Sequence, residues 1–157
     1  VAHEPPSMLL LDDPEPAIAA DRDLHETYLL EGVDAAMAKF FAMAGLDGDE
    51  HGEAPPDFEM PPEAVETFQR VSGNFEYWLA HGMLPLSLYR PDVEALRSGR
   101  PRVVVAIGEE SAGQPIEAMG QALAKHLGIE PSAFPGDHMG FDRDGFAERL
   151  DAVLKNG

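Results

Sequence analysis

His138 is the residue whose type and setting best suit acid–base chemistry. It lies in the segment 134–141, Phe-Pro-Gly-Asp-His-Met-Gly-Phe, between two glycines and just after a short predicted strand. A loop that follows a strand can present a side chain to a cleft. A neutral imidazole there can take a proton from a hydroxyl nucleophile and return it to a leaving group. The plainer interpretation is a histidine on a surface loop.

Ser111 has surroundings that partly match those of a nucleophile. The stretch Glu109-Glu110-Ser111-Ala112-Gly113 lies between a predicted strand and a predicted helix, and it ends like the elbow pattern Gly-x-Ser-x-Gly. Its first position is a glutamate, where the strained turn of an elbow needs a small residue. We therefore do not expect Ser111 to be a nucleophile.

No metal site or cofactor is expected from the sequence. The chain has no cysteine, and its pairs His25-Glu26 and Glu50-His51 are isolated from other ligands. Leu29 occupies the position that would complete a His-Glu-x-x-His pattern after His25. A glycine-rich phosphate-binding loop is also missing from the sequence.

The first part of the chain is predicted to be mostly helical. Residues 1–14 have the pattern of a strand end followed by a loop, and several stretches of residues 15–98 have helical apolar spacing. Asp34 is predicted to cap the second helix. The segment 46–62 holds acidic residues, glycines and prolines, which predicts an exposed, mobile linker. The expected helices span residues 16–30, 35–44, 62–80 and 91–97.

The last part, residues 99–157, has a strand–helix–strand–helix pattern. The run Val103-Val104-Val105-Ala106-Ile107 suits a strand buried on both faces of a parallel sheet. This alternation predicts the α/β class. The expected later elements are a helix over 114–127, a strand over 129–134 and a helix over 142–154.

Three segments of the chain together resemble the C-terminal half of an α/β-hydrolase. The segment 134–141 resembles the loop that carries the triad histidine, and the run from Arg102 to Ser111 resembles the preceding strand and its turn. The opening Val-Ala-His-Glu-Pro-Pro resembles the strand end that follows the nucleophile's helix. The resemblance covers the whole chain and implies that residues 15–98 are the family's helical cap.

The resemblance also suggests where the acid of a triad would lie. An imidazole base needs a buried carboxylate at its other nitrogen. Many relatives place an aspartate in the turn after the penultimate strand, but Ser111 stands there in this chain. Glu110 lies one residue earlier, and Glu4 follows the first strand, where haloalkane dehalogenases place the acid. We slightly favour Glu4 and keep Glu110 as the alternative, whereas Asp137 is expected to face water or brace its loop.

The resemblance implies a hydrolase fragment that acts on an ester-like small molecule through a nucleophile–His–acid triad. The N-terminal half of the fold, including the nucleophile, is expected to lie outside this chain. The alternatives are an epoxide hydrolase or dehalogenase with an aspartate nucleophile, or a non-catalytic binding relative. Met37, Phe41 and Trp78 keep helical spacing and are candidates for an apolar substrate pocket, although core packing is the more common role.

The net charge of -18 bears on partners and location. Such a charge disfavours nucleic acid and anionic lipid as partners. No apolar run is long enough for a membrane helix, and the N-terminus has no signal-peptide core, so we expect a cytoplasmic protein. The first residue is not Met, which suggests that the chain begins inside a larger one. We expect the N-terminal half as a separate piece, or else self-association of the chain.

Overall fold

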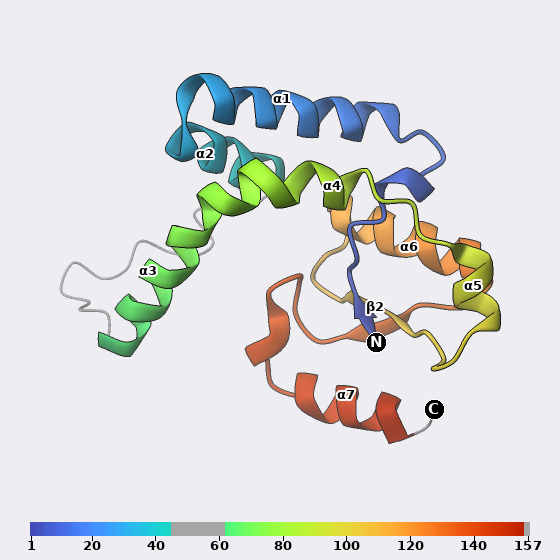
Figure 1. Ribbon diagram of the computed structural model, residues 1–157. Helices are drawn as coiled ribbons and strands as arrows, with labels where there is room; N and C mark the ends of the chain where they lie inside the picture. The colour runs from blue at the N-terminus through green and yellow to red at the C-terminus, as the bar shows by residue number, and fades with distance from the viewer. Residues whose placement is uncertain (45–61, 156–157) are drawn as a thin grey trace. The chain divides into compact units, whose positions relative to one another are not determined.

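The computed structural model describes residues 1–44 and 62–155. This part of the chain is of the mixed α/β class, mostly helical with one small parallel sheet (Figure 1). It divides into two compact units: unit 1 comprises Val1–Ile18 and Ser87–Gly157, and unit 2 comprises Ala19–Leu86. The predicted linker over residues 46–62 falls almost entirely outside the described residues.

Unit 1 contains the sheet. Its strands are β1 (Ala2–His3), β2 (Val105–Gly108) and β3 (Ser132–Phe134), and they pair in parallel in the order β1-β2-β3. The register aligns Ala2 with Val105, and Ala106 with Ser132. Unit 1 also holds the 3₁₀ helices η1 (Met8–Leu10) and η4 (Gly140–Asp142), and the helices α5 (Val93–Ser98), α6 (Pro115–Leu127) and α7 (Phe146–Lys155).

Helices α6 and α7 cover opposite faces of the sheet (Figure 1). Successive side chains of a strand point to opposite faces. Val105 and Ile107 therefore pack against α6, in a cluster with Leu123, whereas Ala106 lies on the other face, in a cluster with Phe146 of α7. All four residues of β2 are buried, as the apolar run predicts. Complete burial of a Val or Ile side chain contributes about 1.5–3 kcal/mol.

Unit 2 is built from helices. Its elements are α1 (Glu15–Glu31), whose first turn belongs to unit 1, α2 (Val33–Ala44), α3 (Pro62–Tyr77), the π-helix η3 (Trp78–Gly82) and α4 (Met83–Ser87). Residues from α1, α2, η3 and α4 meet in one apolar cluster, because these helices bury their apolar stripes together. The buried members are Leu24, Ala36, Met37, Leu79 and Met83.

Several predicted boundaries are wrong by a few residues. Asp34 does not cap α2, because the helix begins at Val33 and places the carboxylate in its first turn. Helix α3 ends at Tyr77, and helical structure continues beyond residue 80 through η3 and α4. Strand β2 begins at Val105 instead of Val103. The last helix begins at Phe146 because Gly145, with φ of +86°, interrupts the helical backbone.

Candidate functional site

The carboxylate of Glu4 lies at the carboxyl end of the sheet, in contact with His138. The backbone N–H of Glu4 donates to the carbonyl of Ala106 at 2.9 Å, which extends the pairing of β1 with β2. Its Oε1 accepts a hydrogen bond from the N–H of Gly108 at 2.8 Å, and its Oε2 lies 3.1 Å from Nδ1 of His138. Glu4 is fully buried, and each of its two carboxylate oxygens has a polar partner within the protein.

The backbone at Glu4 departs from strand geometry. Its φ is +41°, in the left-handed region that residues other than glycine rarely adopt. Such a conformation costs about 1–3 kcal/mol and persists only where the surrounding structure holds it. Neighbouring side chains on a regular strand point to opposite faces. The turn at Glu4 breaks this alternation, so that His3 and Glu4 both approach His138.

The loop that carries His138 is fastened to the end of β2. The N–H of Glu110 donates to the carbonyl of Gly136 at 3.0 Å. Gly136 has φ of +79°, and a Cβ placed on Gly108 would collide with the carbonyl oxygen of Gly136. Oδ1 of Asp137 accepts a hydrogen bond from the N–H of Met139 at 2.9 Å, so Asp137 braces the loop as predicted. The two glycines permit the close approach that places His138 over Glu4.

His138 keeps one nitrogen available for chemistry. Its side chain is 44% exposed, and Nδ1 faces the buried carboxylate. Among the described residues, Nε2 has no hydrogen-bond partner. When Nδ1–H donates to Glu4, the lone pair of the neutral ring lies on Nε2. This arrangement orients the imidazole of His138 against a fully buried carboxylate.

His3 lies beside this pair in an aromatic environment. Its ring meets those of Phe134, Phe141 and Phe146 edge to face. The ring of His138 lies at an angle of 22° to it, at a centroid distance of 6.2 Å. Both ring nitrogens are buried and have no hydrogen-bond partner among the described residues. Burial lowers the pKa of His3 below its usual range, and the nearby His138 acts in the same direction, while Glu4 and Asp137 oppose them.

The two candidate acids have different partners. Glu4 contacts His138, which is the geometry predicted for the favoured acid. The carboxylate of Glu110 instead forms an exposed ion pair with Arg143 at 3.2 Å. The catalytic role of either residue stays a prediction. Ser111 is fully buried, and its Oγ has no hydrogen-bond partner in the described part of the chain.

Comparisons with protein-family models, with curated proteins and with solved structures find no match for this chain.

The three predicted pocket residues lie in unit 2. Met37 is a buried member of the helical core, and Trp78 packs against the same cluster. The ring of Phe40 meets that of Trp78 at a centroid distance of 5.0 Å. Phe41 is 38% exposed and contacts Phe75 edge to face. Core packing accounts for Met37 and Trp78, whereas a role in substrate binding stays a prediction for all three.

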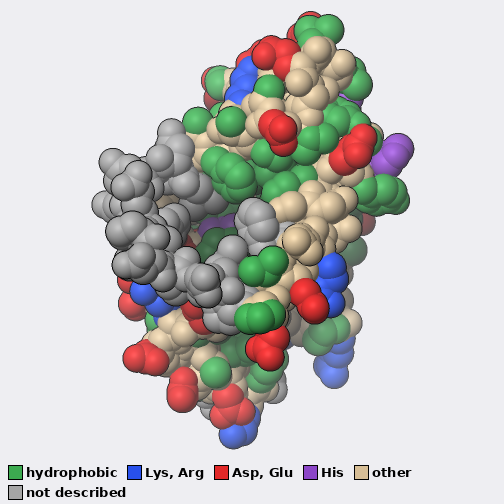
Figure 2. Space-filling model, turned by 90° about the vertical axis from the view of Figure 1, so that its left-hand side faces the viewer, with side chains coloured by type: hydrophobic (Ala, Val, Ile, Leu, Met, Phe, Trp, Pro, Cys, Tyr) green, Lys and Arg blue, Asp and Glu red, His purple; other side chains and the backbone are tan. Residues whose placement is uncertain are grey.

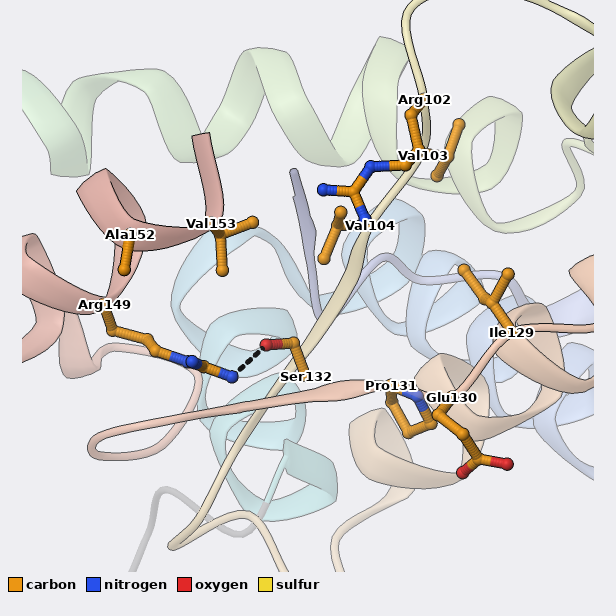
Figure 3. A pocket seen from close by; sticks show the side chains of 10 residues that line it. All are labelled: Arg102, Val103, Val104, Ile129, Glu130, Pro131, Ser132, Arg149, Ala152 and Val153. Atoms are coloured by element: carbon orange, nitrogen blue, oxygen red, sulfur yellow. Dashed lines mark hydrogen bonds between the residues drawn. The ribbon is translucent and has the colours of Figure 1, made fainter. Parts of the chain in front are cut away.

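A hollow at the opposite end of the sheet is shown in Figure 3. It is lined by residues that precede β2, by the start of β3 and by one face of α7. Arg149 points across it and donates to Oγ of Ser132 at 2.7 Å. Ligands of parallel α/β sheets bind beyond the carboxyl ends of the strands. The hollow lies at the amino ends, so we place the candidate site at Glu4 and His138 instead.

Two features of the described residues bear on partners: the distribution of acidic side chains and the character of the helices. Acidic side chains are spread over the face seen in Figure 2 and do not gather in one patch there. None of the helices in the described ranges combines the length and the apolar character needed to cross a bilayer.

Sequence reasoning missed one residue of this site. His3 was not singled out, although it is adjacent to Glu4 at the strand end. The signal was a histidine and a glutamate side by side where a predicted strand stops. Only the left-handed backbone at Glu4 turns that pair toward the same loop.

Proposed function

We propose that Glu4 and His138 are the acid and the base of a nucleophile–His–acid triad in an α/β-hydrolase. The observation that carries the proposal is the 3.1 Å contact between buried Oε2 of Glu4 and Nδ1 of His138, with the imidazole half-exposed. The parallel order β1-β2-β3, with α6 and α7 on opposite faces, supports the same fold. Unit 2 would be the helical cap, and the nucleophile would lie outside these 157 residues.

The geometry suits acyl transfer to water. Glu4 would hold the tautomer in which Nδ1 carries the proton, so that Nε2 takes the proton of the nucleophile's hydroxyl as its oxygen attacks the ester carbonyl. Nε2 would then pass that proton to the departing alcohol. In the second half, a water molecule gives a proton to Nε2 and attacks the carbonyl carbon of the acyl group. The bond between the acyl carbon and the nucleophile's oxygen then breaks, Nε2 returns its proton to that oxygen, and the carboxylic acid leaves. The substrate class is an activated, ester-like small molecule.

The test is hydrolysis of p-nitrophenyl acetate by the intact protein that contains these residues. We expect His138→Ala to lower kcat by at least about 10³-fold, because no other group would take the nucleophile's proton. The matched control is His81→Ala, which removes an exposed imidazole from unit 2 and should leave kcat nearly unchanged. Circular dichroism checks that both variants fold. Full activity of His138→Ala would overturn the proposal.

A second measurement identifies the nucleophile. A fluorophosphonate probe reacts with an activated serine, and peptide mapping then locates the modified residue. We expect the label on a serine outside this chain. A label on Ser111 would contradict the proposal. Hydrolysis without any label would favour the alternative of an aspartate nucleophile, as in epoxide hydrolases and dehalogenases.

A further inference from the structure

We propose that His3, Glu4 and His138 together form a binding site for a divalent transition-metal ion such as Zn²⁺. The three side chains each offer a ligand atom, and these atoms all lie within 4.8 Å of one another. The inference does not rest on the proposed hydrolase activity, because it concerns equilibrium binding of an ion. It would hold equally for a chain without a nucleophile.

The kinds of ligand atom select the class of ion. Two imidazole nitrogens and one carboxylate oxygen are the mixed set that Zn²⁺, Co²⁺ and Fe²⁺ accept. Mg²⁺ and Ca²⁺ prefer sites made of oxygen atoms alone. Three protein ligands would leave a fourth position of a tetrahedral ion open to water.

The nitrogens of His3 are an independent observation that points to a ligand. Both are buried and lack a hydrogen-bond partner among the described residues. Buried polar atoms are nearly always paired, because leaving them unpaired costs free energy. The aromatic rings around His3 offer no strong acceptor or donor. An ion bound next to His138 would satisfy one of these nitrogens by coordination.

The geometry requires only a small adjustment. Ligand atoms about 2.1 Å from a tetrahedral ion are about 3.4 Å apart. His138 can close the remaining gap because its side chain is 44% exposed and lies in a loop. Glu4 is already oriented, since its Oε1 accepts from the N–H of Gly108 and its Oε2 faces the other ligands. A hydrogen bond of this kind to a metal-binding carboxylate fixes its direction.

The ion and the hydrogen bond between Glu4 and His138 exclude each other. An ion at this position would take the place of the proton between Nδ1 and Oε2, and the base would lose its orienting partner. The concentration of free transition-metal ion would therefore determine whether Glu4 holds His138 by a hydrogen bond or both residues bind the ion. No step of hydrolysis is assigned to the ion.

Binding of Zn²⁺ to the intact protein, measured by calorimetry with Mg²⁺ in excess, tests the proposal. The Mg²⁺ occupies weak carboxylate sites, which matter in a chain of net charge -18. We expect a tight site for one ion per chain. His3→Phe, which suits the aromatic surroundings, and His138→Ala should each raise the Kd by at least about tenfold. The control His81→Ala should leave the Kd unchanged.

Co²⁺ provides a second readout, because its visible spectrum reports nitrogen ligands. We expect the spectrum of the unaltered protein to change in both His3→Phe and His138→Ala. An unchanged Kd and spectrum in both variants, or an equal loss in His81→Ala, would overturn the proposal. If His3→Phe fails to fold by circular dichroism, His138→Ala decides the question alone. Hydrolysis is not measured, so a negative result leaves the proposed function untouched.

Discussion

Oε2 of Glu4 lies 3.1 Å from Nδ1 of His138, although 134 positions separate the two residues in the sequence. Two steps of strand pairing bring them together. Glu4 follows β1, which pairs with β2, and His138 follows β3, which pairs with β2 on the other side. Because the strands are parallel, both residues emerge at the same end of the sheet.

The role of Glu4 as the orienting acid predicts a difference between two matched variants. In the intact protein, Glu4→Gln should lower kcat for p-nitrophenyl acetate by at least about 10³-fold, because the amide cannot hold the charged imidazole and favours the wrong tautomer. Glu110→Gln should leave kcat nearly unchanged, because Glu110 pairs with Arg143 at the surface. The reverse ranking of the two variants would make Glu110 the acid.

His3 predicts a specific dependence of stability on pH. Its pKa is lowered by burial from an ordinary value of 6.5, so below that pH the unfolded chain takes up a proton that the folded protein resists. The free energy of unfolding should therefore fall as the pH drops through this window, until His3 also titrates in the folded state. Urea titrations at several pH values, with EDTA present, measure the effect.

The variant His3→Phe isolates the contribution of His3 to the pH dependence of the free energy of unfolding. It removes the titrating group and both unpaired nitrogens, so we expect the free energy of unfolding at pH 7 to rise by about 1 kcal/mol and its pH dependence to weaken. His81→Ala is the control for the general effect of losing a histidine. A pH dependence that is the same in His3→Phe as in the unaltered protein would refute the prediction.

The close approach of Gly108 to the His138 loop predicts a localised defect. A Cβ at Gly108 would clash with the backbone of Gly136 and Asp137, so Gly108→Ala should destabilise the fold by about 1–3 kcal/mol and displace His138. The control is Gly73→Ala in α3, where a Cβ meets nothing and should stabilise the helix by about 0.5–1 kcal/mol. Urea unfolding measures both, and an equal effect of the two substitutions would contradict the prediction.

The sheet predicts association of the chain. Among the described strands, β1 pairs only with β2, and β3 pairs only with β2, so each has a free edge. Such edges form hydrogen bonds with other chains. We expect the isolated 157-residue chain to self-associate or to copurify with a complementary piece, as light scattering and mass spectrometry would show. A monodisperse monomer with a cooperative melt would speak against the proposed fragment of a larger fold.

Much of the local structure was predictable, because it depends on neighbouring residues. The β-branched run predicted a strand that is buried on both faces, and β2 is such a strand. Gly32 and Gly128 follow the last residues of α1 and α6 with positive φ, a conformation that glycine adopts at little cost. The predicted start of the last helix at residue 142 is wrong, because Gly145 adopts a positive φ and α7 begins only at Phe146.

The composition of the site was decided by tertiary structure. The sequence alone left Glu4 and Glu110 as alternatives for the carboxylate beside His138, and it did not indicate His3. The choice depends on the register of β1, β2 and β3 and on the left-handed turn at Glu4. Neither can be read from local residue patterns, because register arises from pairing between distant segments, and the turn persists only where the surrounding packing holds it.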